Sequence, residues 1–238
     1  MLQTAGVRDV KIDATDADGG VGSMLLHVTV TDDATETPLT ASSAADDITG
    51  TANADDATLD AGAGAYTGTV SLGAGQDYLE IAADASLGAA QLNMGKDDDK
   101  VVIAQTGANT ATATIQLGGG DDIVELTTEH SGLYTISLGT GSDIVRISAT
   151  SLAANASVSL YTGDDTLDLS ALDLTTVDET AYTTSGAATA ALTGADIAYA
   201  TTAGSDTFVY IDTDDDDTAE ITIQLLDLVS FDTDSIML

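Results

Sequence analysis

The chain has 238 residues, 43% of them hydrophobic, and its 40 acidic against five basic residues give a formal charge of −35. This charge excludes nucleic-acid binding through phosphate neutralisation and indicates cations as partners. The absence of cysteine excludes disulfides and thiolate metal sites. No stretch of the sequence approaches the roughly 18 apolar residues of a membrane span, so no membrane insertion is expected.

Residues 1–45 form the first region, for which we predict a small β cap or linker. Val7–Ile12 and Met24–Thr31 predict two strands around an acidic turn, and Pro38 stands in a polar stretch suited to a linker. The turn contains Asp16-Ala-Asp18-Gly19, which shares only the centre of an EF-hand loop, so a solvated turn is favoured. The N-terminus lacks the charged start and apolar run of a cleaved signal peptide.

Residues 46–170 form the second region, which is repetitive. After a degraded copy at residues 46–61, a twelve-residue pattern begins at Val70, Ile115, Ile136 and Val158. In every copy, apolar residues stand seven and five positions before a shared aspartate and two and four positions after it. This pattern predicts two alternating strands joined by a Gly-rich loop.

A fifth copy is interpreted as carrying a loop two residues longer, beginning at Leu92-Asn-Met-Gly95 and ending at Asp98–Ile103. With that reading the copies recur after 20, 25, 21 and 22 residues, a mean of 22. A single unit cannot bury its own apolar face, but coils stacked at about 4.8 Å build a continuous core. The sequence therefore predicts an all-β protein, a parallel β-solenoid with a coil of about 22 residues.

Such stacking places the shared acids in one column, formed by Asp77, Asp97 or Asp99, Asp122, Asp143 and Asp165. Two carboxylates about 5 Å apart repel by roughly 1 kcal/mol in water and roughly 3 kcal/mol at an effective dielectric constant of 20. A hard divalent cation relieves this repulsion. Calcium suits the site best because it accepts six to eight oxygens in flexible geometry, including the carbonyls of Gly-rich loops.

These loops resemble the repeats-in-toxin (RTX) calcium-binding β-roll, whose unit is Gly-Gly-x-Gly-x-Asp-x-U-x with U a large apolar residue. The segments 72–80, 117–125 and 138–146 match it except at the first Gly. The family has a calcium loop about every nine residues on both edges, whereas here the loop returns every 22 or so on one edge, which implies a one-edged roll. Tyr161 and Asn93 depart from the second Gly in their copies.

The resemblance implies that the aspartates and loop carbonyls bind calcium between successive turns. The candidate metal residues are Gly73, Gly75, Asp77, Gly95, Asp97, Asp99, Gly118, Gly120, Asp121, Asp122, Gly139, Gly141, Asp143, Gly163, Asp164, Asp165 and Asp206. No catalytic residue and no cofactor other than calcium is expected. His27 and His130 have no partner constellation in the sequence and are interpreted as structural.

Residues 171–238 form the last region, predicted as irregular coils followed by closing strands. The segment 203–210 restores a Gly-x-Asp loop at Asp206, with Phe208 and Tyr210 at core positions. The run from Asp212 to Asp217 is interpreted as a solvated acidic loop, and Ile221–Phe231 as closing strands. By resemblance, the tail from Asp227 to Leu238 is compatible with an uncleaved type I secretion signal, which implies an extracellular or cell-surface location.

Two structural functions and one enzymatic function remain open. We expect a calcium-dependent, self-assembling surface-layer or fibre subunit, and the alternative is a calcium-stiffened stalk or adhesin module whose partner is a cell-surface polysaccharide. A polysaccharide-active enzyme is disfavoured because the array has few bases and the chain has no Trp. Adaptation to high salt is a rival explanation of the charge, although clustering of Asp in the loops favours calcium.

The expected partner is a second copy of the chain, bound through strand edges or calcium bridges. Lysine and proline usually guard exposed edges, and the chain has no lysine after Lys100 and only one proline. The strands at Ile221–Phe231 are therefore predicted to be an open edge.

Overall fold

The computed structural model describes residues 6–15, 21–30, 39–41, 43–60, 65–106, 111–127, 134–148, 156–159, 164–178, 180–194, 196–201, 206–226 and 236–238. The chain divides into two compact units, residues 1–36 and residues 37–238. The first unit contains an antiparallel pair, β1 (Gly6–Thr15) and β2 (Val21–Val30). The two predicted N-terminal strands are thus confirmed, whereas Asp16, Asp18 and Pro38 lie outside the described residues.

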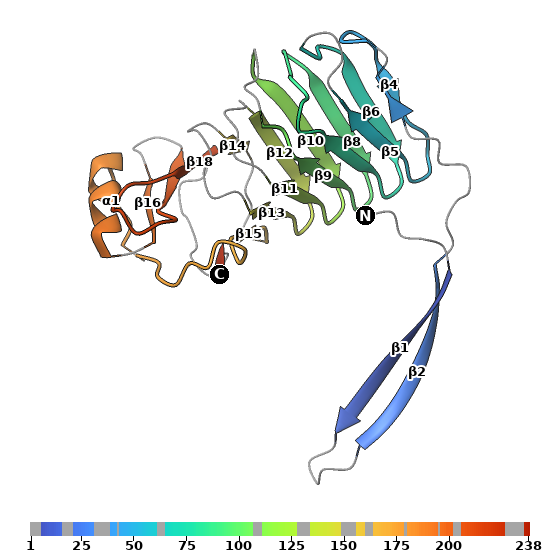
Figure 1. Cartoon of the computed structure of the whole chain (residues 1–238), viewed down its shortest axis with the longest axis horizontal. Helices are drawn as coiled ribbons and strands as arrows, with labels where there is room; N and C mark the ends of the chain where they lie inside the picture. The colour runs from blue at the N-terminus through green and yellow to red at the C-terminus, as the bar shows by residue number, and fades with distance from the viewer. Residues whose placement is uncertain are drawn as a thin grey trace. The chain divides into compact units, whose positions relative to one another are not determined.

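The second unit contains two long sheets, and from β3 to β15 successive strands of the chain alternate between them (Figure 1). The coils contribute to the nine-stranded sheet β4 (Ile48–Thr49), β6 (Thr69–Ala74), β8 (Gln91–Lys96), β10 (Ala113–Gly119), β12 (Tyr134–Thr140) and β14 (Ala156–Ser159). They contribute to the eight-stranded sheet β3 (Leu39–Thr40), β5 (Asp56–Leu59), β7 (Tyr78–Ile81), β9 (Lys100–Ile103), β11 (Ile123–Leu126), β13 (Ile144–Ile147) and β15 (Thr166–Asp168). All these neighbours pair in parallel, which confirms the predicted solenoid.

The core lies between the two sheets and is built from ladders of aliphatic side chains. Strict alternation of buried and solvent-facing residues along each strand produces these ladders. In one ladder, Leu79, Val101 and Val124 lie in register on neighbouring strands and are fully buried. Because each ladder continues through every coil, the apolar face of one coil is covered by the coils before and after it as well as by the opposite sheet.

The coil at residues 91–103 corrects the sequence interpretation. Val70 pairs with Leu92 and Gly73 with Gly95, so Met94, not Leu92, takes the place of Leu72. The predicted two-residue insertion is therefore wrong, and the coils repeat after 22, 23 and 21 residues at Leu72, Met94, Leu117 and Leu138. The physical reason is that Met94 fills the core position as well as leucine does, with no exposed surface.

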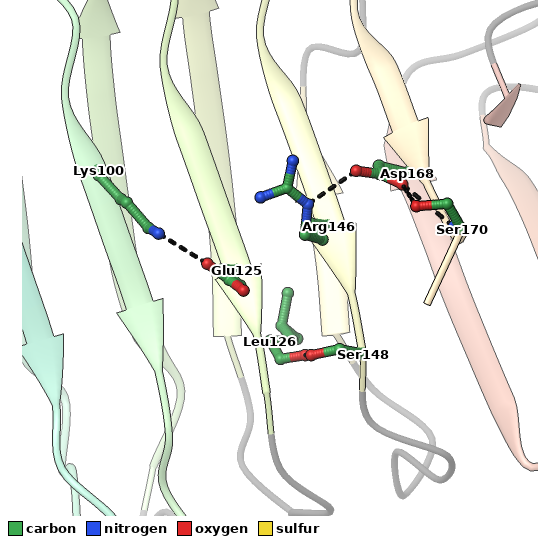
Figure 2. Close-up of polar contacts among 7 residues, drawn as sticks. All are labelled: Lys100, Glu125, Leu126, Arg146, Ser148, Asp168 and Ser170. Atoms are coloured by element: carbon green, nitrogen blue, oxygen red, sulfur yellow. Dashed lines mark hydrogen bonds and ion pairs between the residues drawn. The ribbon is translucent and has the colours of Figure 1, made fainter. Parts of the chain in front are cut away.

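The outward face of the eight-stranded sheet carries charged side chains that bridge neighbouring coils (Figure 2). Lys100 on β9 forms an ion pair with Glu125 on β11, with 2.8 Å between Nζ and Oε2. Arg146 on β13 donates from Nε to Oδ2 of Asp168 on β15 at 2.7 Å, and Asp168 also accepts from the hydroxyl of Ser170. These contacts place two of the five bases on this face and join strands that are also paired through their backbones.

The C-terminal region departs from the repeat. The short helix α1 (Ser185–Ala191) and the 3-10 turn Leu192–Gly194 precede β16 (Ile197–Thr201), β17 (Thr207–Ile211) and β18 (Ile221–Leu226). The pairs β16–β17 and β17–β18 are antiparallel, β18 continues the nine-stranded sheet beside β14, and β19 (Ile236–Met237) pairs with β15. Closing strands were predicted and are confirmed, but the helix was not predicted.

The prediction that residues 203–210 restore a coil of the repeat is wrong. β17 is antiparallel to both its neighbours, so it is one arm of a hairpin and does not belong to a stacked turn. Val209 and Ile211 face the main core, whereas Tyr210, with Phe208 beside it, packs in a second small cluster with Ala188 and Leu192 of the helical segment. The apolar alternation was recognised, but the opposite phase faces the solenoid core.

The predicted open edge at Ile221–Phe231 is also wrong for its described part. β18 lies inside the nine-stranded sheet, between β17 and β14, so its backbone groups are paired on both sides. Residues 227–231 lie outside the described residues. Among the described residues, no helix has the length and apolar character needed to cross a membrane.

Candidate metal sites

The shared aspartates form a column through the solenoid, at the junction between the two strands of each coil. Its members are Asp55, Asp77, Asp99, Asp122, Asp143 and Asp165. In each step, Oδ1 of one aspartate accepts the backbone N–H of the aspartate in the preceding coil. The N···Oδ1 distance is 2.8 Å in the first four steps and 3.1 Å from Asp143 to Asp165. Each aspartate side chain therefore provides the hydrogen-bond acceptor for a backbone N–H in the loop of the preceding coil.

In the interior of the column, the second carboxylate oxygen of each aspartate has no partner within the described part of the chain. Oδ2 of Asp77, Asp99, Asp122 and Asp143 is buried and accepts no hydrogen bond in the described structure. These four residues expose at most 2% of their surface. A buried carboxylate oxygen without a partner has a large desolvation cost, so the column calls for a proton or a cation at these atoms.

The electrostatics of the column agree with this geometry. Burial raises the pKa of Asp99 to about 7, with Asp77 and Asp122 as further negative neighbours, although the N–H of Asp77 opposes the shift. Burial likewise raises the pKa of Asp77 and of Asp122 to about 6, and it raises that of Asp143. The ionised column is thus unfavourable without a positive charge close to it.

The glycines of the loops permit the close stacking of the coils. Gly73, Gly95, Gly118 and Gly139 lie in register in one row. Gly118 has φ of 110°, and a Cβ there would overlap the carbonyl oxygen of Gly95 in the coil below. A side chain at this place would separate the coils and open the column, because both the backbone angle and the space require glycine.

Asp97 and Asp99 differ in their roles, which the sequence left open. Asp99 belongs to the column, whereas Asp97 takes the place that Gly75 and Gly120 occupy in other coils and has φ of 71°. Its Oδ2 accepts the backbone N–H of Gly75 at 3.1 Å. An aspartate tolerates this left-handed backbone better than most residues do, which explains how the coil lacks the glycine.

A second row of acids runs along the exposed side of the column. Asp98 accepts the N–H of Asp121 at 3.0 Å, and Asp121 accepts the N–H of Ser142 at 2.9 Å, so these acids bond to the following coil. The column aspartates bond to the preceding coil. Each loop is thereby hydrogen-bonded to the coil before it and to the coil after it. The exposed row also adds negative charge beside the buried column.

The remaining predicted site residues have different positions. Asp164 is exposed next to the column, and Gly163 and Tyr161 lie outside the described residues. Asp206 is not in the column: its Oδ2 accepts from Nε2 of Gln224 at 2.8 Å, near the antiparallel hairpin. Asp55 and Asp98 were missed. The 22-residue step back from Asp77 was a signal for Asp55 that the degraded coil concealed.

A separate acidic cluster lies in the loop between β17 and β18, where the sequence favoured a solvated loop. Ligand atoms of Asp212, Asp214, Asp216 and Glu220 all lie within 4.8 Å of one another. At this separation each pair of charges repels by about 1 kcal/mol even in water. Carboxylates at the first, third, fifth and ninth places of a loop were the available signal, since calcium loops use this alternation.

The backbone of this loop is folded around Asp212, which directly follows β17 and is 3% exposed. Its carboxylate accepts the N–H groups of Asp214, Asp215 and Asp217 at 2.8–3.1 Å. Glu220 directly precedes β18 and accepts the N–H of Thr213 at 2.8 Å. The hairpin thus fixes the two ends of the cluster, while Asp214 and Asp216 are exposed at its tip.

Comparison with known proteins gives no family for the chain. No protein-family model matches the sequence, and no curated protein is similar to it. The fold and the sites define its class as an acidic parallel β-solenoid with a buried aspartate column.

Proposed function

We propose that this chain is a calcium-stabilised structural protein that assembles outside the cell as a subunit of a surface layer or fibre. The observation that carries the calcium part is the set of four buried Oδ2 atoms for which the described residues supply no partner. A cation bound beside these oxygens would compensate the free-energy cost of burying them. Without a bound cation, each oxygen keeps its full desolvation cost.

Calcium is favoured over other cations by the chemistry of the donors. The column offers buried carboxylate oxygens beside Gly-rich loops, and the chain has no cysteine. Hard oxygen donors in flexible loops suit calcium, whereas magnesium prefers rigid octahedral geometry and keeps more of its water. Asp77, Asp99, Asp122 and Asp143 would hold the ions of the column, and the cluster from Asp212 to Glu220 would hold another.

A structural role is favoured by the regularity of the fold and by the use of its bases. Lys100 and Arg146 are engaged in ion pairs that bridge neighbouring coils. They are therefore poorly suited to the neutralisation of an acidic sugar, which a polysaccharide-cleaving enzyme needs. The many coil-to-coil bonds instead favour a rigid rod whose stability depends on ions.

Calcium titration of chelated protein, followed by circular dichroism and sedimentation velocity, tests this proposal. We expect strand content and resistance to denaturant to rise with calcium, because an ion that binds only the folded state adds its binding free energy to folding. Magnesium and added sodium chloride serve as controls. If sodium chloride reproduces the whole effect, adaptation to salt explains the charge; if the folded chain stays monomeric, the stalk or adhesin reading replaces the assembly.

A further inference from the structure

Eight side chains on the outward face of the nine-stranded sheet form a surface that we call the hydroxyl–amide face. Its two rows cross β6, β8, β10 and β12 in register. The first row is Thr69, Gln91, Thr114 and Thr135, and the second is Ser71, Asn93, Gln116 and Ser137. All eight are uncharged, in a chain whose formal charge is −35.

This face is open to solvent in the described chain. Five of its residues are exposed and three are half-buried. At the C-terminal end of the same sheet the situation is different, because α1 packs against Ala198 and Ala200 of β16. The sequence supplies small apolar residues where the helix covers the sheet and polar uncharged residues where nothing in the described chain covers it.

The two outward faces of the solenoid also differ in charge. The eight-stranded sheet carries Glu80 on β7. It also carries the ion pairs Lys100–Glu125 and Arg146–Asp168, which Figure 2 shows. The loop edge carries the exposed Asp97, Asp98 and Asp121. A second copy approaching the loop edge meets like charges, whose repulsion is screened only beyond about 8 Å at physiological salt. On the eight-stranded sheet, Glu125 and Asp168 are already paired with Lys100 and Arg146, and Glu80 adds a further negative charge.

From these observations we propose that the hydroxyl–amide face is where a second copy of this chain packs, face to face, within the assembly. The inference rests on the self-assembly part of the proposed function and names its interface. Hydroxyl and amide groups both donate and accept hydrogen bonds, so the face is complementary to itself under a two-fold rotation. It is also the face on which two acidic copies approach with the least repulsion.

The size of the face determines the strength of the contact. Four strands at about 4.8 Å and three residues at about 3.3 Å cover roughly 190 Å². A stable pair buries about 800 Å² per partner, so one such contact is weak. The interface therefore belongs to an array in which each copy makes several contacts, and an isolated pair forms only at high protein concentration.

The test uses the full chain with calcium and a single introduced cysteine, since the natural chain has none. Gln116→Cys lies in the middle of the face, and Ala83→Cys, exposed in a return turn away from it, is the control. Under mild oxidation we expect at least fivefold more disulfide-linked dimer from Gln116→Cys. Equal crosslinking of the two variants contradicts the proposal.

A charge variant gives a second, independent measurement. Gln116→Glu keeps the size of the side chain and adds one negative charge to each copy, and Ala83→Glu adds the same charge elsewhere. In sedimentation at high protein concentration, we expect the association constant to fall at least fivefold for Gln116→Glu and less than twofold for Ala83→Glu. If the wild type does not associate at all, the interface is wrong.

These results are separable from those of the proposed function. Circular dichroism of the same samples reports calcium-linked folding without any association. Assembly that persists in Gln116→Glu overturns this interface alone. A fold unaffected by calcium overturns the calcium part alone, and the crosslinking comparison then decides on the face by itself.

Discussion

The carboxylate of Asp122 accepts the backbone N–H of Asp99, the aspartate of the preceding coil, at 2.8 Å through Oδ1, while its Oδ2 is buried and has no partner among the described residues. One oxygen of the side chain thus holds two coils together, and the other carries an unfavourable charge. This division of roles within one carboxylate allows the structural and ionic contributions of the column to be tested separately.

Replacing Asp122 by asparagine separates them. Asp122→Asn retains an oxygen that accepts the N–H of Asp99 but removes the buried charge. Without calcium we expect the free energy of unfolding to rise, because the variant loses a buried charge with its desolvation cost and its repulsion from Asp143. With calcium we expect the variant to gain less stability than the wild type. Urea unfolding with calcium or chelator measures both effects.

The matched control for this substitution is Asp84→Asn, which removes one exposed charge in a return turn outside the column. It should leave the calcium response unchanged. A calcium response of normal size in Asp122→Asn would show that Oδ2 of this residue does not bind the ion.

Stability without calcium should depend on pH in the direction opposite to ordinary acid denaturation. In the folded chain, burial raises the pKa of Asp99 from 3.8 to about 7, so the folded state binds its proton more tightly than the unfolded state does. Unfolding free energy then falls as the pH rises from about 4 to about 7. Denaturant titrations at several pH values in chelator measure this slope.

Asp99→Asn is the control for the pH slope, because asparagine does not titrate. The variant should show a shallower fall in stability over the same range, with the contributions of Asp77 and Asp122 left. A wild-type stability that increases between pH 4 and pH 7 in chelator contradicts the raised pKa values.

Close stacking at the glycine row predicts a strong effect of a single methyl group. Gly118→Ala places a Cβ against the carbonyl of Gly95 at φ of 110°. We expect a loss of at least about 2 kcal/mol of unfolding free energy, from the backbone angle together with the displaced coil. Thermal and urea unfolding in calcium provide the measurement.

Gly186→Ala is the matched glycine control, since a Cβ at Gly186 meets nothing within 4 Å. Gly186 lies in α1, where alanine favours the helix by roughly 0.5–1 kcal/mol. This variant should be neutral or slightly more stable. Equal destabilisation by both substitutions would argue against close contact at the glycine row.

The hairpin loop should respond to calcium independently of the column. Asp214→Asn removes one exposed carboxylate from the cluster of Asp212, Asp216 and Glu220 without changing the core. Because asparagine keeps an oxygen ligand but loses the charge, we expect one calcium ion per chain to bind more weakly in equilibrium dialysis, while calcium-linked formation of the coils persists. Asp206→Asn, outside the cluster, is the comparison and should leave the affinity for every ion unchanged.

Several features could be predicted from the sequence because they repeat. The period-two alternation around Asp77, Asp122 and Asp143 predicted the parallel coils, their buried ladders and the aspartate column. A two-residue insertion was wrongly predicted near Asp97 because Leu92 and Met94 are both apolar and both face the core. Only strand pairing shows that Met94, and not Leu92, corresponds to Leu72. The sequence did not reveal that the carboxylates of Asp212, Asp214, Asp216 and Glu220 come together, because charge alone does not distinguish a solvated loop from a folded one.

Within the stacked coils, the sequence by itself determined the mean coil length, the phase of the buried residues and the column of acids, since a period of two in side-chain direction is a local property of extended chains. Only the tertiary structure decided how each carboxylate is used. Asp99 entered the column and Asp97 the glycine place because register with Asp77 and Gly75 fixes both. The order of the C-terminal strands was likewise decided by packing, since β18 pairs with β14, a strand far earlier in the chain.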